Sequence, residues 1–129
     1  MYRDTIIELY KNPFNKGVLV DADITHSGAN VTCGDRVRIY LKLTADQSIV
    51  HEARFEGEGC AISIAAASLI TDYIKNKPVA KIAQCGVREI NSLLRVELSP
   101  SRIKCGLLAL ETIQMGLNRG GASLTSKNR

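Results

Sequence analysis

Three cysteines stand at places where the local structure of the chain is expected to change. Cys33 precedes an alternating segment, Cys60 follows the next one, and Cys105 lies in the first turns of a segment with an apolar stripe. A cysteine near a helix N-terminus feels the positive end of the helix dipole, which favours the thiolate. The thiolate is the form of cysteine that binds metal ions and attacks sulfur. These positions therefore predict metal-binding or sulfur-transfer chemistry.

Asp35 offers a fourth possible ligand, two residues after Cys33. Gly34 between them lets the loop bend so that both side chains can face one ion. Three thiolates and one carboxylate can complete a tetrahedral Zn²⁺ site or hold an iron–sulfur cluster. Carboxylate oxygen is a harder donor than thiolate, so Asp35 would hold a soft metal weakly and favour release. Because free cysteine is often a small buried apolar residue, the spacing alone leaves structural thiols as an equal alternative.

Two alternating segments must bring these ligands together. Apolar and polar residues alternate over residues 36–43, which is the period of a strand with one buried face. A polar turn at residues 45–48 leads into a second such strand, so the two form an antiparallel hairpin with Cys33 and Cys60 at its ends. The predicted buried face of the second strand carries Ile49, His51, Ala53 and Phe55, with Val50 on the exposed face and His51 as a partly buried packing residue.

The remaining segments predict one further strand and several helices. Residues 18–24 are expected to form a first strand at the edge of the sheet. Helices are expected over residues 4–10, from residue 60 to near residues 76–78, in short pieces around Ile82 and Ile90, and after the helix-start signal Ser99-Pro100. The predicted fold is α+β: a small three-stranded antiparallel sheet with helices packed on one face. We expect a single domain over residues 1–118 and a flexible tail over residues 119–129.

The composition argues against several other functions. The chain has 129 residues, a formal net charge of +4, 5% aromatic residues and no tryptophan. Its basic residues are scattered, so the basic stripe with interleaved aromatics that is typical of nucleic-acid binding is missing. No apolar run approaches the ~20 residues that span a bilayer, and the first residues lack a signal-peptide layout. We therefore expect a cytoplasmic protein without nucleic-acid or membrane partners, whose cysteines are thiols or ligands rather than disulfides.

Three motifs surround the cysteines: Cys33-Gly34-Asp35, Gly57-Glu58-Gly59-Cys60-Ala61-Ile62-Ser63 and Arg102-Ile103-Lys104-Cys105. Together they closely resemble the IscU/SufU family of iron–sulfur cluster assembly scaffolds, which are NifU N-terminal domain-like proteins. The resemblance runs from about residue 2 to residue 117, and the opening stretch around residues 9–19 shares it.

This resemblance implies a fold, a task and a ligand set. The implied fold is a SufE/NifU-like two-layer sandwich. The implied task is to accept sulfur from a pyridoxal-phosphate-dependent cysteine desulfurase. Iron or a transient [2Fe–2S] cluster would be bound and handed to apo iron–sulfur proteins. Cys33, Asp35, Cys60 and Cys105 match the family's ligand positions one by one, and Zn²⁺ can occupy the same set.

The chain combines features of two branches of the family. Lys104 stands where IscU-type members have a histidine, and residues 98–102 (Leu-Ser-Pro-Ser-Arg) depart from the Leu-Pro-Pro-Val-Lys stretch that chaperones recognise, which puts chaperone docking in doubt. The Arg-Ile-Lys-Cys motif is SufU-like, yet only 44 residues separate Cys60 from Cys105, which is the shorter, IscU-like distance. The resemblance implies a scaffold and sulfur acceptor rather than an independent enzyme. The alternatives are a zinc-dependent sulfurtransferase and a zinc-stabilised interaction or nucleic-acid module.

Five residues carry narrower expectations about their individual roles. Cys33 and Cys105 are both candidate persulfide acceptors. Arg102 and Lys104 are candidates to support a thiolate by their positive charge, although a solvated surface role fits Lys104 equally well. Cys85 matches no ligand position and is expected to be a structural or half-buried thiol near a helix end.

Overall fold

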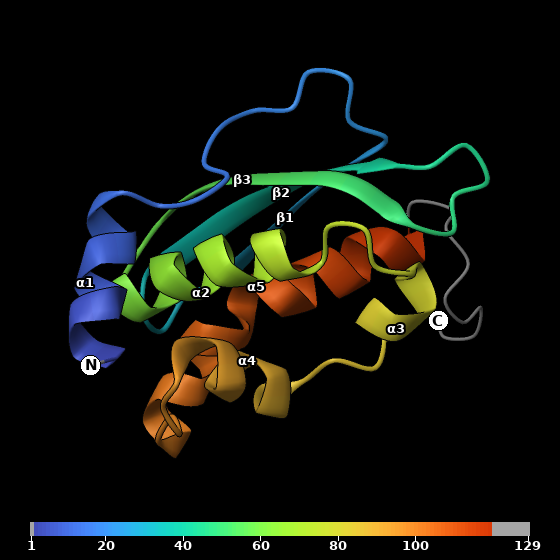
Figure 1. Cartoon of the computed structure of the whole chain (residues 1–129). Helices are drawn as coiled ribbons and strands as arrows, with labels where there is room; N and C mark the ends of the chain where they lie inside the picture. The colour runs from blue at the N-terminus through green and yellow to red at the C-terminus, as the bar shows by residue number, and fades with distance from the viewer. Residues whose placement is uncertain (1, 120–129) are drawn as a thin grey trace.

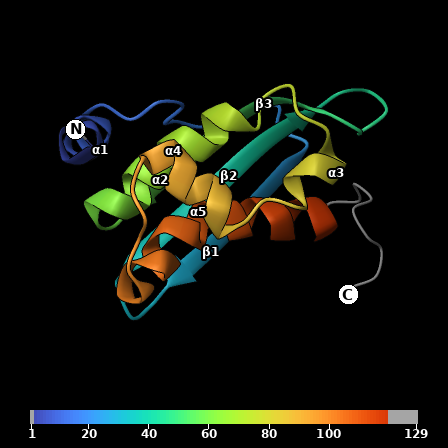
Figure 2. The ribbon, with the colours of Figure 1, turned by 60° about the horizontal axis from the view of Figure 1, so that its bottom comes forward.

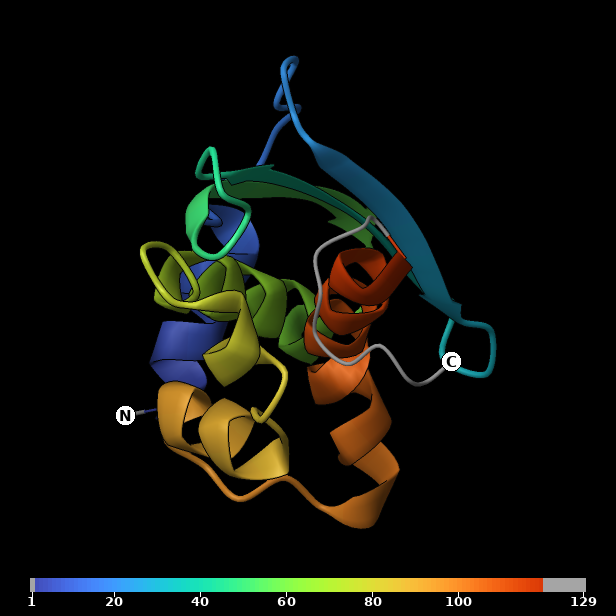
Figure 3. The ribbon, with the colours of Figure 1, turned by 90° about the vertical axis from the view of Figure 1, so that its right-hand side faces the viewer.

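Helices cover one face of a three-stranded antiparallel sheet (Figures 1 and 3). The computed structural model describes residues 2–119. The strand order in the sheet, β1-β2-β3, is the order in the chain. The predicted α+β fold with helices on one face is therefore confirmed. The elements follow one another as α1 (Tyr2–Lys11), β1 (Ile24–Asn30), β2 (Asp35–Leu43), β3 (Val50–Glu58), α2 (Ala61–Tyr73), α3 (Val79–Ile82), α4 (Val87–Leu94) and α5 (Pro100–Arg119).

The first strand lies later in the chain than the sequence predicted. Residues 18–23 are irregular and the Val20 side chain is 95% exposed, so the prediction of a strand over residues 18–24 is wrong. Strand β1 reads Ile-Thr-His-Ser-Gly-Ala-Asn, and its small and polar residues give no apolar alternation to detect. Its pairing with β2 joins Asn30 to Asp35 at one end. Cys33 consequently lies in the turn between these two strands.

A β-bulge changes which side chains face inward at the start of β3. The register passes from Lys42↔Glu52 to Leu43↔Val50, which leaves His51 as the extra residue. His51 is exposed, whereas Val50 is fully buried. The predicted packing role of His51 and the predicted exposure of Val50 are therefore both wrong. One inserted residue moves the preceding side chains to the opposite face, and alternation alone cannot reveal it.

Helices α2 and α5 pack side by side beneath the sheet (Figures 2 and 3). Helix α5 approaches β1 so closely that a Cβ on Gly28 would lie 2.2 Å from Oγ1 of Thr112. Only glycine fits at this contact. The contact fixes α5, and with it Cys105, against the strand that leads into the turn of Cys33. The largest fully buried side chains come from both layers and include Phe55, Ile39, Leu41, Ile70, Leu110 and Ile113.

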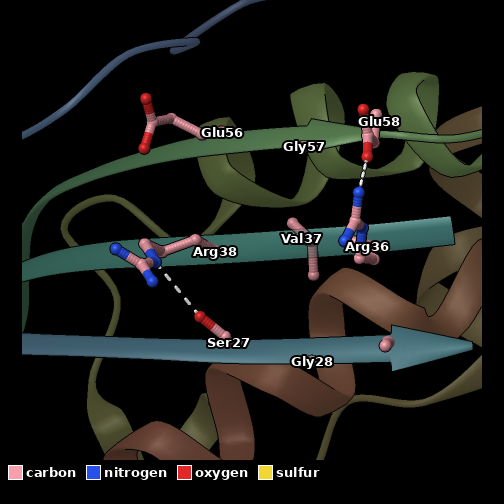
Figure 4. Close-up of a pocket in the computed structure, with 9 residues that line it drawn as sticks. Ser27, Gly28, Arg36, Val37, Arg38, Glu56, Gly57 and Glu58 are labelled. Carbon is pink, nitrogen blue, oxygen red and sulfur yellow. Dashed lines mark hydrogen bonds and ion pairs between the residues drawn. The ribbon is translucent and has the colours of Figure 1, made fainter.

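The face of the sheet that the helices leave uncovered carries charged side chains paired across strands (Figure 4). Arg36 of β2 forms an ion pair with Glu58 of β3. Arg38, two residues further along β2, donates a 3.1 Å hydrogen bond to the Ser27 hydroxyl of β1. The arginines of β2 therefore bond to acceptors on both neighbouring strands.

The segment after α1 covers the outer edge of β3. Gly17 donates its N–H to the Phe55 carbonyl at 2.8 Å, and the Phe55 N–H returns a 2.9 Å bond to the Asn15 carbonyl. The Asn15 side chain donates to the Thr71 hydroxyl of α2 and accepts a 2.6 Å bond from Lys75. These contacts tie the N-terminal segment to both layers.

The described part of the chain ends with α5. Arg119, the first residue of the predicted tail, is the last residue of this helix. The rest of that tail, residues 120–129, lies outside the described residues. No helix within residues 2–119 is long and apolar enough to cross a membrane.

Ser68 of α2 provides a test of this packing. Its hydroxyl is fully buried and, among the described residues, has no hydrogen-bond partner. An unsatisfied buried polar group costs roughly 1–3 kcal/mol, so Ser68→Ala should raise the free energy of unfolding by about 1 kcal/mol and the melting temperature by several degrees. Denaturant titration and calorimetry would measure both.

A matched control is Thr71→Val. The Thr71 hydroxyl donates to the Ala67 carbonyl at 2.7 Å and accepts from Asn15. Its removal should destabilise the protein, since Asn15 loses a partner. Equal destabilisation by both substitutions would show that the Ser68 hydroxyl is satisfied after all.

Candidate metal centre

The turn between β1 and β2 presents Cys33 to solvent. The Cys33 N–H donates to the Asn30 carbonyl at 3.2 Å, which closes the turn. The Asn30 side-chain amide lies 3.5 Å from the Cys33 sulfur and donates to it. Gly34 follows with a φ of +73°, a left-handed conformation that glycine adopts without a steric penalty. The turn therefore exposes one sulfur and directs the chain back towards Asp35.

Asp35 is fully buried at the start of β2. Its Oδ1 accepts a 2.9 Å hydrogen bond from the Cys60 N–H. Gly59 makes this contact possible, because a Cβ on Gly59 would lie 2.2 Å from Oδ1 and the residue has a φ of +153°. The second oxygen, Oδ2, lies 3.8 Å from the Cys60 sulfur. One carboxylate oxygen thus fixes the backbone while the other faces a thiol.

Cys60 is the N-cap residue of α2, and its sulfur accepts from the Ser63 N–H at 3.4 Å. An N-cap side chain normally satisfies one of the free N–H groups of the first helical turn. Here a thiol does so, which places the Cys60 sulfur at the positive end of the helix dipole. The predicted position of Cys60 at a strand-to-helix junction is confirmed by the bounds of β3 and α2.

Cys105 lies in α5 and is only 2% exposed. Its sulfur is 3.3 Å from that of Cys33. Burial, the hydrogen bond to Cys33 and the nearby Cys60 sulfur raise the pKa of the Cys105 thiol well above its ordinary range. The expectation that the helix start favours its thiolate is therefore wrong, because Cys105 lies more than a turn inside α5 and desolvation dominates.

The ligand atoms of Cys33, Asp35 and Cys105 all lie within 4.8 Å of one another, and Cys60 contacts Asp35. In the described part of the chain, no lysine, arginine or histidine makes a hydrogen bond or ion pair with these four residues. Deprotonated thiols here would repel one another unless a cation joined them. Tetrahedral zinc–thiolate geometry sets sulfurs ~3.8 Å apart, so a small outward shift of the turn would suit this ion. The donor set fits a thiophilic metal.

The two basic residues near Cys105 do not reach the thiols. Arg102 and Lys104 are both exposed. Within residues 2–119, neither forms a hydrogen bond or ion pair with a member of the donor set. Their predicted support of a thiolate stays a prediction.

Cys85 lies apart from this set, in the connection between α3 and α4. Its sulfur donates to the Lys81 carbonyl at 3.6 Å, and partial burial raises the pKa of the thiol. This arrangement agrees with the half-buried thiol that the sequence predicted. The contacts of Asn30 and Ser63 were not predicted, since neither residue belongs to a ligand pattern.

A family model described as the NifU-like N-terminal domain matches residues 1–120. The chain belongs to this family. A zinc-dependent sulfurtransferase SufU from Bacillus subtilis is 38% identical, over 91% of this chain and 89% of the relative. The iron–sulfur cluster assembly scaffold protein IscU of Escherichia coli K12 is 31% identical, over 90% and 91% of the two chains. The family resemblance inferred from the motifs is thus confirmed.

Solved structures share the fold of this NifU-like domain. An iron–sulfur cluster assembly scaffold protein for the SUF system from Fervidobacterium islandicum superimposes with a TM-score of 0.68 at 26% identity, covering 88% of this chain and 94% of that one. A NifU-like N-terminal protein from Brucella abortus gives 0.71 at 19% identity, covering 90% and 91%. The second likeness concerns the fold alone.

Of these two relatives, SufU and not IscU differs from this NifU-like domain in the length of the matched region. The match to SufU spans 134 aligned positions yet takes in only 91% of the 129 residues, so SufU has additional residues inside the matched region. The match to IscU spans 119 positions and 90% of the chain, which leaves little room for insertions. The domain therefore combines an IscU-like length with higher identity to this SufU.

Gly59→Ala should damage the site without removing a ligand. The added methyl group would collide with Asp35 and disfavour the observed φ. We expect zinc affinity to fall at least tenfold, measured by competition with a chromophoric chelator. Gly34→Ala is the control, because it also has positive φ but no atom within 4 Å of the added Cβ. Equal losses in both variants would mean that backbone strain, and not the Asp35 position, controls affinity.

Proposed function

We propose that this NifU-like domain is an iron–sulfur cluster assembly scaffold. It accepts sulfur from a pyridoxal-phosphate-dependent cysteine desulfurase, binds iron or a transient [2Fe–2S] cluster, and passes it to apo-proteins. The observation that carries the proposal is the convergence of Cys33, Asp35 and Cys105 within 4.8 Å, with Cys60 against Asp35. The name of the E. coli relative supports the same task. Cys33, Asp35, Cys60 and Cys105 are the proposed ligands.

The two proposed sulfur acceptors, Cys33 and Cys105, differ in exposure and therefore in their proposed roles. Cys33 is exposed, whereas Cys105 is 2% exposed. A desulfurase can present its persulfide only to a sulfur that it can reach, so Cys33 is the proposed entry point. Its thiolate attacks the outer sulfur, the S–S bond of the desulfurase persulfide breaks, and the desulfurase thiolate leaves. Cys33 then carries the persulfide, next to the Cys105 sulfur.

Asp35 is proposed as the ligand that makes the cargo exchangeable. Its carboxylate is harder than the thiolates and already accepts a hydrogen bond from Cys60. Both properties weaken its hold on iron. Three thiolates would therefore retain the cargo while the carboxylate yields its place to an incoming thiolate of an apo-protein.

The second candidate is a zinc-dependent sulfurtransferase that relays persulfide sulfur. It is favoured by the 38% identity to a protein of that name and by the Arg102-Ile103-Lys104-Cys105 motif. Zn²⁺ would occupy the same four residues, which supply three thiolates and one carboxylate. Metal analysis of protein prepared without oxygen, with and without a desulfurase present, separates the two candidates: stable zinc favours the relay, and iron with labile sulfide favours the scaffold.

The proposed setting is the cytoplasm, where thiols stay reduced. The proposed partners are the desulfurase and apo iron–sulfur proteins. A dedicated chaperone is left out of the proposal, because residues 98–102 lack the stretch that such chaperones recognise in the family.

Substitution of Asp35 tests the scaffold proposal. After anaerobic reconstitution with iron, sulfide and a desulfurase, Asp35→Ala should lengthen the lifetime of the coloured cluster severalfold, because the exchangeable ligand is gone. Asp35→Asn keeps an acceptor for the Cys60 N–H and should behave alike. Asp21→Ala changes an exposed carboxylate outside the site and serves as the control. Unchanged cluster absorbance decay in both Asp35 variants would refute this role.

The entry thiol has its own test. Cys33→Ser should abolish stimulation of desulfurase turnover, followed by alanine release, because no acceptor sulfur remains within reach. Cys85→Ser should retain full stimulation, since Cys85 lies outside the donor set. If Cys33→Ser keeps the stimulation, then another cysteine is the acceptor.

A further inference from the structure

Two of the four thiols touch each other across a long stretch of chain. The Cys33 and Cys105 sulfurs lie 3.3 Å apart, although 72 positions separate the residues in sequence. A disulfide needs about 2.05 Å between its sulfurs. A movement of little more than 1 Å would therefore bring the pair to bonding distance.

The two members of this pair differ in their access to solutes. Cys33 is exposed and lies in a turn, while Cys105 is buried within α5. A small oxidant can reach Cys33 first and convert its thiolate to sulfenic acid. Cys105 is shielded from the oxidant but stands in contact with the sulfur that has reacted. An accessible thiol next to a protected one is the arrangement of a reacting and a resolving cysteine.

The turn has room to make the required movement. A Cβ on Gly34 would have no atom within 4 Å, and the Val31 side chain is 89% exposed. The position of Cys105 is fixed, because α5 packs tightly on β1 through Gly28. The turn that carries Cys33 would therefore move towards Cys105, and few buried contacts would be lost.

We propose that Cys33 and Cys105 form an oxidative modification site, at which hydroperoxides convert the metal-free pair into a reversible intramolecular disulfide. The Cys33 sulfur attacks the peroxide oxygen, the O–O bond breaks, and sulfenic acid and one water form. The Cys105 sulfur then attacks the Cys33 sulfur, the S–O bond breaks, and the oxygen leaves as water with the Cys105 proton. Two thiols are oxidised by two electrons while one hydrogen peroxide becomes two waters.

The same disulfide would prevent metal binding at the four proposed ligands. A sulfur bonded to another sulfur no longer offers a thiolate to a metal, so oxidation would empty the centre and a bound metal would protect the pair. This protection rests on the proposed ligand set. The disulfide itself does not, because it needs only the contact and the unequal exposure.

The full-length protein tests this inference. One sample is stripped with a chelator without oxygen and a second is loaded with zinc, and both receive hydrogen peroxide. We expect the stripped protein to lose two of its four thiols and about two mass units, with tryptic peptides of Cys33 and Cys105 cross-linked and released by a dithiol reductant. The zinc-loaded protein should react at least tenfold more slowly.

Matched variants identify the resolving thiol. Cys85→Ser should cross-link like the wild type. Cys105→Ser should leave Cys33 unresolved, so that it proceeds to sulfinic acid. The wild-type peptide map decides even if Cys105→Ser fails to fold. A cross-link from Cys33 to Cys60 or Cys85, sulfinic acid at wild-type Cys33, or retention of all four thiols overturns the inference. Equal rates with and without zinc contradict the shared ligand set, while the Cys33–Cys105 cross-link still supports the pair.

Discussion

One hydrogen bond, from the Cys60 N–H to Asp35 Oδ1, joins the two segments on which the site is built. It connects the start of β2 to the start of α2, and hydrogen bonds to charged groups are worth about 1.5–3 kcal/mol. It requires a glycine at position 59, since any side chain there would occupy the place of the carboxylate. Because Cys33 lies two residues before Asp35, the same bond also sets the base of the turn that carries the exposed sulfur.

This bond gives Asp35 two tasks that compete. The carboxylate must stay buried to hold β2 against α2, yet the proposed function asks it to bind and release metal. The two oxygens divide these tasks, with Oδ1 on the backbone and Oδ2 towards the Cys60 sulfur. Release of metal would then leave the backbone contact intact. The scaffold can therefore be emptied and filled around a fixed framework.

The sequence predicted those features that produce a recognisable pattern in neighbouring residues. The alternation before Leu43 and the capping signal before α5 identified two elements, and the motifs identified four ligand candidates. It missed β1, whose small residues show no period, and the bulge at His51, which depends on strand pairing. It also misjudged the Cys105 thiol, because desolvation by packing against distant residues outweighs position in the helix. Features set by contacts between distant segments were thus the ones that local patterns could not supply.

The 72 positions between Cys33 and Cys105 have a consequence for biosynthesis. The second of these sulfurs exists only after 72 further positions have been synthesised, and α5 must then dock under β1. A chain that lacks Cys105, or in which α5 has not docked, cannot present all four ligands to a metal. By mass action, the captured metal in turn favours the folded state that binds it. Metal binding and folding of the chain would thus be coupled through two sulfurs that lie far apart in the sequence.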